Sequence, residues 1–198
     1  MGHERMGQER TTAGLSKALA GAMALACATV TFAAPPVPVA AASLEYPVKA
    51  NYLVKFAAFV DWPSDAFASA SSPITVCVLG EDPFGPDLDR AAAAEVVGGR
   101  HLLVRRLSRI DSRSGCQLVY LGKSRTESVS EALAALAGAP VLTVTDEARG
   151  GDRGVIHFAI TGNRVRFHID DQSAARAHLS ISSRLLSLAL SVRPRRPA

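Results

Sequence analysis

The sequence predicts one α/β domain with a mixed, mostly parallel sheet that ends in a β-hairpin followed by a long apolar helix. Short apolar runs of β-branched character recur along the chain, and stretches with helical spacing separate them. A Gly-Asn pair then joins two strand-like runs in the pattern of a two-residue hairpin. Apolar residues at helical spacing follow as far as residue 192.

Residues 1–42 have the pattern of a cleavable secretory signal peptide. Basic residues precede an apolar run over residues 18–34, and small residues lead up to Ala42. We therefore expect cleavage after Ala42 and a periplasmic protein. A membrane anchor is less favoured, because the run is rich in alanine and lacks the roughly 20 strongly apolar residues that a span needs.

Residues 43–192 are expected to form the domain, and residues 193–198 a basic, proline-containing tail in solvent. The formal net charge of +4 is too small to indicate a nucleic-acid partner.

Two cysteines, Cys77 and Cys116, follow the predicted signal peptide, and each lies in a strand-like apolar run. Two thiols in an oxidising compartment usually pair. A disulfide between them would close a loop of about 40 residues and stabilise the fold by roughly 3–4 kcal/mol on a chain-entropy argument. A redox centre is less favoured, because the two do not form a C-x-x-C motif.

Residues 48–60 have apolar side chains at helical spacing, and Pro63 ends this first helix. Phe59 and Trp62 at its end are either an exposed aromatic platform or part of the core, and burial is the usual fate of such a stripe.

The middle of the chain alternates strands with helices. A strand over residues 74–80 is followed by an alanine-rich helix, strands over residues 101–107 and 116–122, a helix over residues 126–136 and a strand over residues 141–146.

Residues 155–170 form the predicted hairpin, with apolar residues matched on one face and His157 opposite His168 on the other. This polar face, which Arg166 shares, is either solvated or faces a partner. A metal site is the less favoured alternative, because the two histidines would need further ligands, and only Asp152, His101 or His178 could supply one.

The last helix is expected over residues 172–192. Its apolar arc, which includes Ile181, Leu185 and Leu188, is wider than one sheet face requires. The surplus is either buried in the monomer, which is the commoner case, or forms a homodimer interface.

Motifs for a catalytic nucleophile, a phosphate loop, a dinucleotide site or a zinc protease are missing from the sequence, so we expect neither an enzyme nor a cofactor. Asp82 follows one predicted strand and Asp146 ends another, at the sheet edge where α/β proteins often bind ligands. A periplasmic small-molecule-binding protein therefore stays as an alternative.

Four blocks occur in order: KANYLVKFAAFVDWP, ITVCVLGEDPFG, PVLTVTD before two glycines and VIHFAI, and RVRFHIDDQSAARAHLSISSRLLSLA. Behind an export signal and around two cysteines, they resemble the YfiR family of periplasmic regulators from about Tyr46 to Val192. The resemblance implies a non-catalytic repressor of an inner-membrane diguanylate cyclase, whose periplasmic portion it binds, so that cyclic di-GMP and biofilm formation fall. It also implies sequestration by an outer-membrane lipoprotein and a tendency to dimerise.

On this interpretation, the candidate partner contacts are Phe59 and Trp62 on the first helix and His157, Arg166 and His168 on the hairpin. An acidic residue is usual in the family where this chain has His168, so the polar face of the hairpin differs here. Imidazole titrates near pH 6.5, and the facing pair therefore suggests the hypothesis of a pH sensor.

Overall fold

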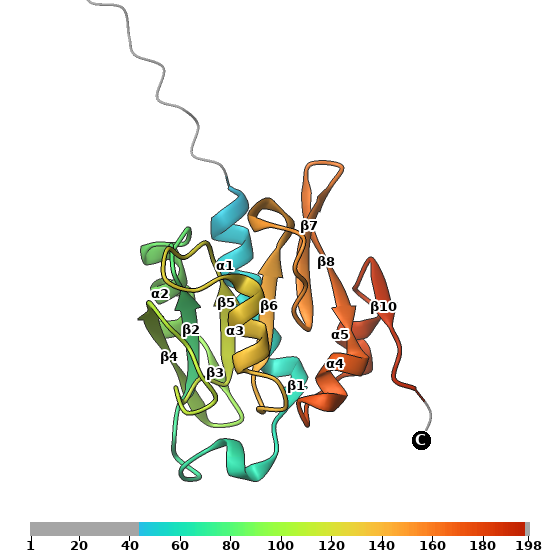
Figure 1. Cartoon of the computed structure of the whole chain (residues 1–198). Coiled ribbons are helices and arrows are strands. Elements are labelled where there is room, and N and C mark those ends of the chain that lie inside the picture. The colour runs from blue at the N-terminus through green and yellow to red at the C-terminus, as the bar shows by residue number, and fades with distance from the viewer. Residues whose placement is uncertain (1–43, 197–198) are drawn as a thin grey trace, which may run out of the picture. The chain divides into compact units, whose positions relative to one another are not determined.

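The apolar, β-branched runs form one eight-stranded sheet in the computed structural model, which describes residues 44–196 (Figure 1). The predicted signal peptide lies outside the described residues. In spatial order the strands are β10 (Ser191–Arg193), β8 (Arg164–Asp170), β7 (Ile156–Thr161), β6 (Leu142–Asp146), β5 (Leu118–Leu121), β2 (Ile74–Leu79), β4 (Arg100–Leu107) and β3 (Val96–Val97).

The five strands from β7 to β4 run parallel, and antiparallel pairs flank them on both sides. Strand β10 pairs in parallel with β8 at the end of the sheet. The predicted mixed, mostly parallel sheet is therefore confirmed. Every residue of β2, β5 and β6 is buried, which explains why these strands read as continuous apolar runs and not as alternating ones.

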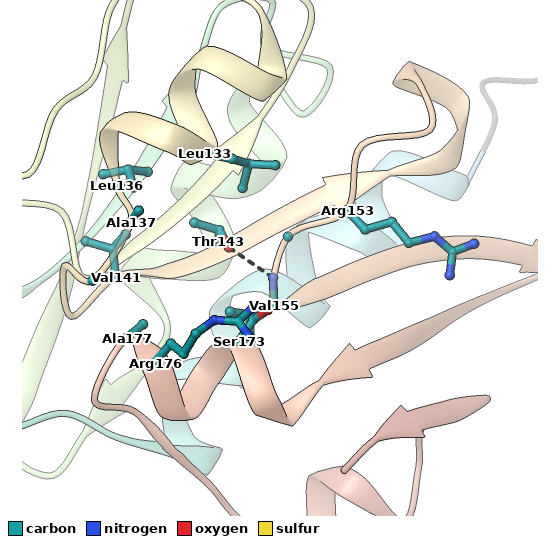
Figure 2. A pocket seen from close by; sticks show the side chains of 12 residues that line it. Leu133, Leu136, Ala137, Val141, Thr143, Arg153, Val155, Ser173, Arg176 and Ala177 are labelled. Atoms are coloured by element: carbon teal, nitrogen blue, oxygen red, sulfur yellow. Dashed lines mark hydrogen bonds between the residues drawn. The ribbon is translucent and has the colours of Figure 1, made fainter. Parts of the chain in front are cut away.

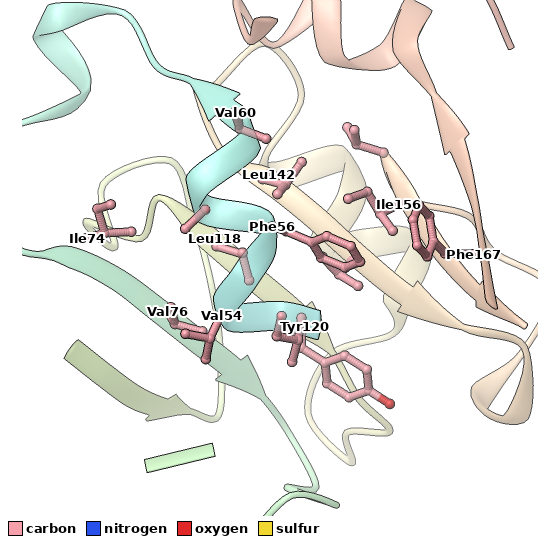
Figure 3. Packing of buried hydrophobic residues seen from close by; sticks show 14 of the residues in the cluster. Val54, Phe56, Val60, Ile74, Val76, Leu118, Tyr120, Leu142, Ile156 and Phe167 are labelled. Atoms are coloured by element: carbon pink, nitrogen blue, oxygen red, sulfur yellow. The ribbon is translucent and has the colours of Figure 1, made fainter. Parts of the chain in front are cut away.

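Helices cover both faces of the sheet (Figure 1). Helices α1 (Glu45–Phe56) and α2 (Pro86–Ala93) pack together over one face, where the larger core lies. Figure 3 shows Phe56 of α1 directed toward Ile156 and Phe167, and its ring lies 5.2 Å from that of Phe167. Burial of one such large apolar side chain stabilises a fold by about 1.5–3 kcal/mol, so α1 is held mainly by this face.

Helix α3 (Val129–Ala135) packs on the opposite face, over a smaller core. Its first turn has a capping box, in which the Ser128 side chain accepts from the Glu131 N–H and the Glu131 side chain accepts from the Ser128 N–H. The predicted disulfide is present in this core. Cys77 of β2 and Cys116 before β5 are bonded, with their Cα atoms 5.9 Å apart.

The β7–β8 hairpin has the predicted register, in which His157 pairs with His168 and Phe158 with Phe167. Gly162 and Asn163 both have positive φ, at 56° and 60°, as a type I′ turn requires. The hairpin is not at the sheet edge as predicted, however, because β10 pairs along the outer side of β8.

The connection from β6 to β7 contains no α-helix. A 3₁₀ turn, η3 (Glu147–Arg149), leads into an irregular segment whose N–H groups at Gly154 and Val155 donate to the hydroxyls of Thr145 and Thr143, at 2.9 and 3.0 Å. A Cβ atom on Gly154 would lie 2.7 Å from the carbonyl oxygen of Thr143. The two threonines thus hold the crossover against β6, and only glycine permits its close approach.

The predicted first and last helices are both shorter in the structure. Helix α1 ends at Phe56, and η1 (Ala57–Phe59) and β1 (Val60–Asp61) follow it; a further 3₁₀ turn, η2, spans Ser64–Ala66. The prediction of one long apolar helix over residues 172–192 is wrong. Its residues form α4 (Asp171–Arg176), β9 (Ser180–Ile181), α5 (Ser183–Leu186) and β10.

Local hydrogen bonds explain why that helix breaks. His178 has a positive φ of 56°, which a helix interior does not tolerate, and β9 pairs with β1 in a second, small sheet. Ser182 caps α5 by accepting from the Arg184 N–H. The basic tail is also not simply solvated, since Arg193 belongs to β10 and Arg195 pairs with Asp171 at 2.9 Å.

Candidate partner-binding surface

A groove opens between the first half of α1, the tip of the β7–β8 hairpin and the residues after α5. We call it the α1–hairpin groove. Its volume is about 1020 Å³, at the upper end of what ligand sites have. Tyr52 of α1 lines it, with its ring 5.8 Å from Phe167 and 6.3 Å from Phe158, so the aromatic core supports the lining of the groove.

Exposed aliphatic side chains surround this groove. Leu44 just before α1 and Val48 on α1 are 76% and 41% exposed, Ile160 on the hairpin 39%, and Leu188 after α5 57%. Single exposed aliphatic residues are normal on a protein surface, but four around one depression make a contiguous apolar patch. Such a patch is typical of a site where another molecule binds.

Two arginines of β8 add positive charge to the groove. Arg164 is exposed and Arg166 is half-buried, and both line it. Neither has a carboxylate partner among residues 44–196, whereas Arg106 on β4 binds both Asp82 and Asp89. Arginine beside apolar side chains is the composition that protein interfaces favour.

A buried ion pair fixes the helix that forms one wall. Lys49 of α1 is fully buried, and its Nζ lies 2.6 Å from Oδ2 of Asp146, which is also fully buried. Glu45 accepts a second hydrogen bond from the same ammonium, and the Tyr120 hydroxyl donates to Asp146 at 3.3 Å. Burial and the Asp146 carboxylate raise the pKa of Tyr120, so its hydroxyl remains a donor. The pair holds α1 to the end of β6.

The carboxyl edge of the parallel strands is closed. The Glu81 N–H after β2 donates to the Lys123 carbonyl after β5 at 2.7 Å, which joins the two loops. Asp82 pairs with Arg106 at 2.7 Å. The cavity beside Asp146 measures about 20 Å³, roughly the volume that one water occupies. Asp82 and Asp146 are therefore both engaged in structural contacts.

Phe59 and Trp62 do not form an exposed platform. Both are half-buried and pack against the larger core. The Trp62 Nε1–H donates to the carbonyl oxygen of Gln117 at 3.1 Å, and the Phe59 carbonyl accepts from the Ser182 N–H. The structure therefore supports the alternative in which these two aromatic residues are part of the core.

The two facing histidines have different surroundings. His157 is 3% exposed, and its Nδ1 lies 2.8 Å from the Thr145 hydroxyl, so it does not face a partner. Burial, and then the positive charges of Arg153 and His168, lower its pKa. His168 is half-buried, and its Nδ1 lies 2.7 Å from the Ser191 hydroxyl of β10.

Among residues 44–196, the structure contains no group of three or more histidine, cysteine or acidic residues that could hold a metal ion. The ring centroids of His157 and His168 lie 6.4 Å apart. The third ligand that a zinc site would require from Asp152, His101 or His178 is therefore not brought to the pair.

The three predicted interface residues separate in the structure. Ile181 and Leu185 are 7% and 2% exposed and belong to the larger core, so they are not available to a second subunit. Leu188 lies at the α1–hairpin groove. The wide apolar arc of the predicted helix is thus explained by two separate short elements, because Ile181 is buried from β9 and Leu185 from α5.

A second cavity, of about 610 Å³, lies between α3, the crossover and α4 (Figure 2). Its apolar lining is already buried in the protein, since Leu136, Val141 and Val155 are each at most 5% exposed. Figure 2 shows the Arg153 side chain extending away from this lining, and Arg176 donates to Ser173. This cavity thus offers less free apolar surface than the α1–hairpin groove.

The residues that sequence reasoning missed are Leu44, Val48 and Ile160. Their apolar character was visible, but each falls on the apolar side of an amphipathic pattern and is indistinguishable there from a core residue. For two of them the available signal is their position near an element end, because Leu44 precedes α1 and only Thr161 separates Ile160 from the hairpin turn.

Comparison with known proteins gives one match. The model of the YfiR/HmsC-like family matches residues 46–190, which include all of α1 except Glu45 and every later element as far as α5. A search among curated proteins found no match. Within residues 44–196, no helix is long and apolar enough to cross a membrane.

Proposed function

The chain belongs to the YfiR/HmsC-like family, and on this premise we propose that it is a non-catalytic periplasmic regulator of a diguanylate cyclase. It binds the periplasmic portion of the inner-membrane enzyme and represses it, which lowers cyclic di-GMP and biofilm formation. The observation that supports this proposal best is the α1–hairpin groove, where exposed aliphatic side chains lie beside two arginines that have no carboxylate partner among residues 44–196.

The groove has what a specific protein contact needs. Interfaces obtain most of their affinity from a few side chains that become fully desolvated, surrounded by contacts that exclude water. Leu188 and Val48 can serve as such anchors, because both are exposed and line the same depression. The arginines add charge complementarity, which governs specificity and the association rate more than raw affinity.

Repression requires no chemistry from this chain. A protein that binds the inactive state of the cyclase more tightly than the active state shifts the population toward the inactive one. A change from one per cent to 99 per cent inactive needs about a 10⁴-fold difference in affinity between the two states. A preformed groove suits this mechanism, because little ordering entropy is lost on binding.

We further propose that an outer-membrane lipoprotein sequesters the repressor by competing for this groove. A homodimer that used the groove would compete in the same way. Of the predicted interface residues, only Leu188 remains available for such a contact.

The first experiment measures binding between residues 43–198 in the oxidised form and the periplasmic portion of a diguanylate cyclase encoded beside the protein. We expect micromolar or tighter affinity by titration calorimetry. Leu188→Glu should weaken binding at least tenfold, because it removes an apolar anchor and would place a carboxylate in a desolvated contact.

Leu103→Glu provides the matched control. Leu103 is 49% exposed on β4, which three strands separate from the hairpin, and should tolerate the charge without any effect on binding. Equal loss in both variants would show that the groove is the wrong surface. Absence of binding by a folded, oxidised wild type would contradict the proposed function itself.

A further inference from the structure

The tip of the β7–β8 hairpin projects beyond both neighbouring strands (Figure 1). On one side, the pairing of β6 with β7 ends at Phe158. On the other, the pairing of β10 with β8 begins at His168. Within residues 44–196, the paired residues nearer the turn, from Ile160 to Val165, therefore have no neighbouring strand on either side.

The register determines which backbone groups point outward from this tip. In a two-residue hairpin, the pair next to the turn, Thr161 and Arg164, exchanges hydrogen bonds, and the next pair does not. Ile160 and Val165 form that next pair, so their N–H and C=O groups point away from the hairpin. Phe167 lies two residues after Val165 on β8, so its backbone groups point in the same outward direction. Its carbonyl indeed accepts from the Leu190 N–H at 2.8 Å.

The two open edges of the tip differ in the hydrogen bonds that their outward N–H groups make. On the β7 edge, the outward N–H of Ile160 donates to the carboxylate of Glu147. On the β8 edge, the structure shows no hydrogen bond from Val165 to any described residue outside its own hairpin. The outer edge of β8 is therefore an open strand edge beside the α1–hairpin groove, which Val165 also lines.

We propose that an extended segment of the partner adds to this edge as a strand, paired with Val165 and continuing the line of β10. This inference rests on the proposed function and specifies how the groove is used. Side chains alternate along such a strand. One set would face the side of the sheet that carries Ile160 and Val165, and the other the side that carries Arg164 and Arg166.

The partner segment should therefore alternate apolar with acidic residues. Its apolar side chains enter the groove, and its carboxylates pair with Arg164 and Arg166, which have no carboxylate partner among the described residues. The same arginines disfavour a basic strand. They also disfavour two hairpin tips of this protein pairing directly, because that arrangement would bring four guanidinium groups together.

The test uses Val165→Pro, which removes the outward N–H while the hairpin's own hydrogen bonds, made by Arg164 and Arg166, stay intact. Proline is tolerated on strand edges that face solvent. Val165→Thr is the control, since it retains the N–H and the β-branched shape. We expect Val165→Pro to weaken binding to the cyclase's periplasmic portion at least tenfold and Val165→Thr less than threefold, by the same calorimetry.

A direct measurement keeps the test decisive if the proline variant folds poorly, as judged from its thermal melt. Hydrogen exchange of the wild-type Val165 amide should slow at least tenfold in the complex, while that of Ile160 changes little because Glu147 already binds it. Binding without protection of Val165 would overturn strand addition and leave the proposed function standing.

A peptide probe separates the two proposals when the cyclase itself does not bind. An eight-residue peptide of alternating glutamate and valine should protect the Val165 amide, and a lysine–valine peptide should not. Protection by the acidic peptide alone supports the strand edge although the cyclase proposal has failed. Protection by neither peptide, or by both equally, overturns the inference.

Discussion

At the scale of single residues, His157 shows what strand alternation predicts and what it leaves open. Alternation places His157 and His168 on one face, and the register confirms this. It does not predict that the crossover before β7 reaches Thr145, the residue that contacts His157. Burial depends on elements that are distant in sequence, so the same pattern fits a buried and an exposed histidine.

The lowered pKa of His157 makes stability depend on pH. The unfolded chain takes up a proton near pH 6.5, whereas the folded chain does not until the pH falls to the lowered pKa. The free energy of unfolding should therefore fall as the pH drops below about 6.5, until the pH reaches the folded-state value. His157→Gln should make this decline shallower in urea titrations between about pH 7.5 and 5.5.

His101→Gln is the control for loss of an imidazole, because His101 is exposed on β4. Wild type and the control should show the same decline. If His157→Gln declines as steeply as they do, the buried imidazole is not the group responsible, and the carboxylates account for the acid sensitivity.

At the scale of elements, the hairpin was predictable and the C-terminal helix was not. The hairpin rests on local chemistry, since Gly162 and Asn163 accept the positive φ that its turn requires. Residues 172–192 have apolar side chains at helical spacing, but serines compete with the helix through local hydrogen bonds, as Ser182 does. Pairing of β10 with β8 then replaces helical hydrogen bonds, and such long-range pairing has no local signal.

The crossover between β6 and β7 gives a prediction at this scale. Gly154→Ala should lower the free energy of unfolding by about 1–3 kcal/mol, because the new methyl group meets the Thr143 carbonyl and the strand cannot yield without losing pairing. Gly151→Ala in the same segment is the control, since no atom lies within 4 Å of a Cβ there. Urea titration measures both, and equal values for the two variants would contradict a tight crossover.

At the scale of the whole molecule, the buried pair of Lys49 and Asp146 joins the helical layer to the sheet. Removal of one member leaves the other charge buried without its partner, which costs about 3–5 kcal/mol. Lys49→Met should therefore lower the free energy of unfolding by about this amount in urea titrations.

The double variant Lys49→Met with Asp146→Asn tests the cause. It removes both charges and should recover most of the lost stability, because paired buried charges contribute little net free energy. A double variant as unstable as Lys49→Met alone would show that the loss comes from packing of the lysine stem and not from an uncompensated carboxylate.

The overall architecture was accessible from the sequence because alternation of strands and helices is a repeated local pattern. The position of the candidate surface was not. Val48 and Ile160 meet at one groove only because α1 crosses the sheet over the hairpin, and no spacing along the chain predicts that crossing.

The parallel pairing of β10 with β8 has a practical consequence for how the protein can be attached to a support. Strand β8 runs from the hairpin tip toward Asp170, and β10 runs the same way, so the chain leaves the sheet at the end opposite to the tip (Figure 1). A biotin or fluorophore attached at the end of β10 would therefore lie away from Leu188 and Val165. When the protein is attached to a sensor surface through that end, every molecule would have its groove directed toward the solution.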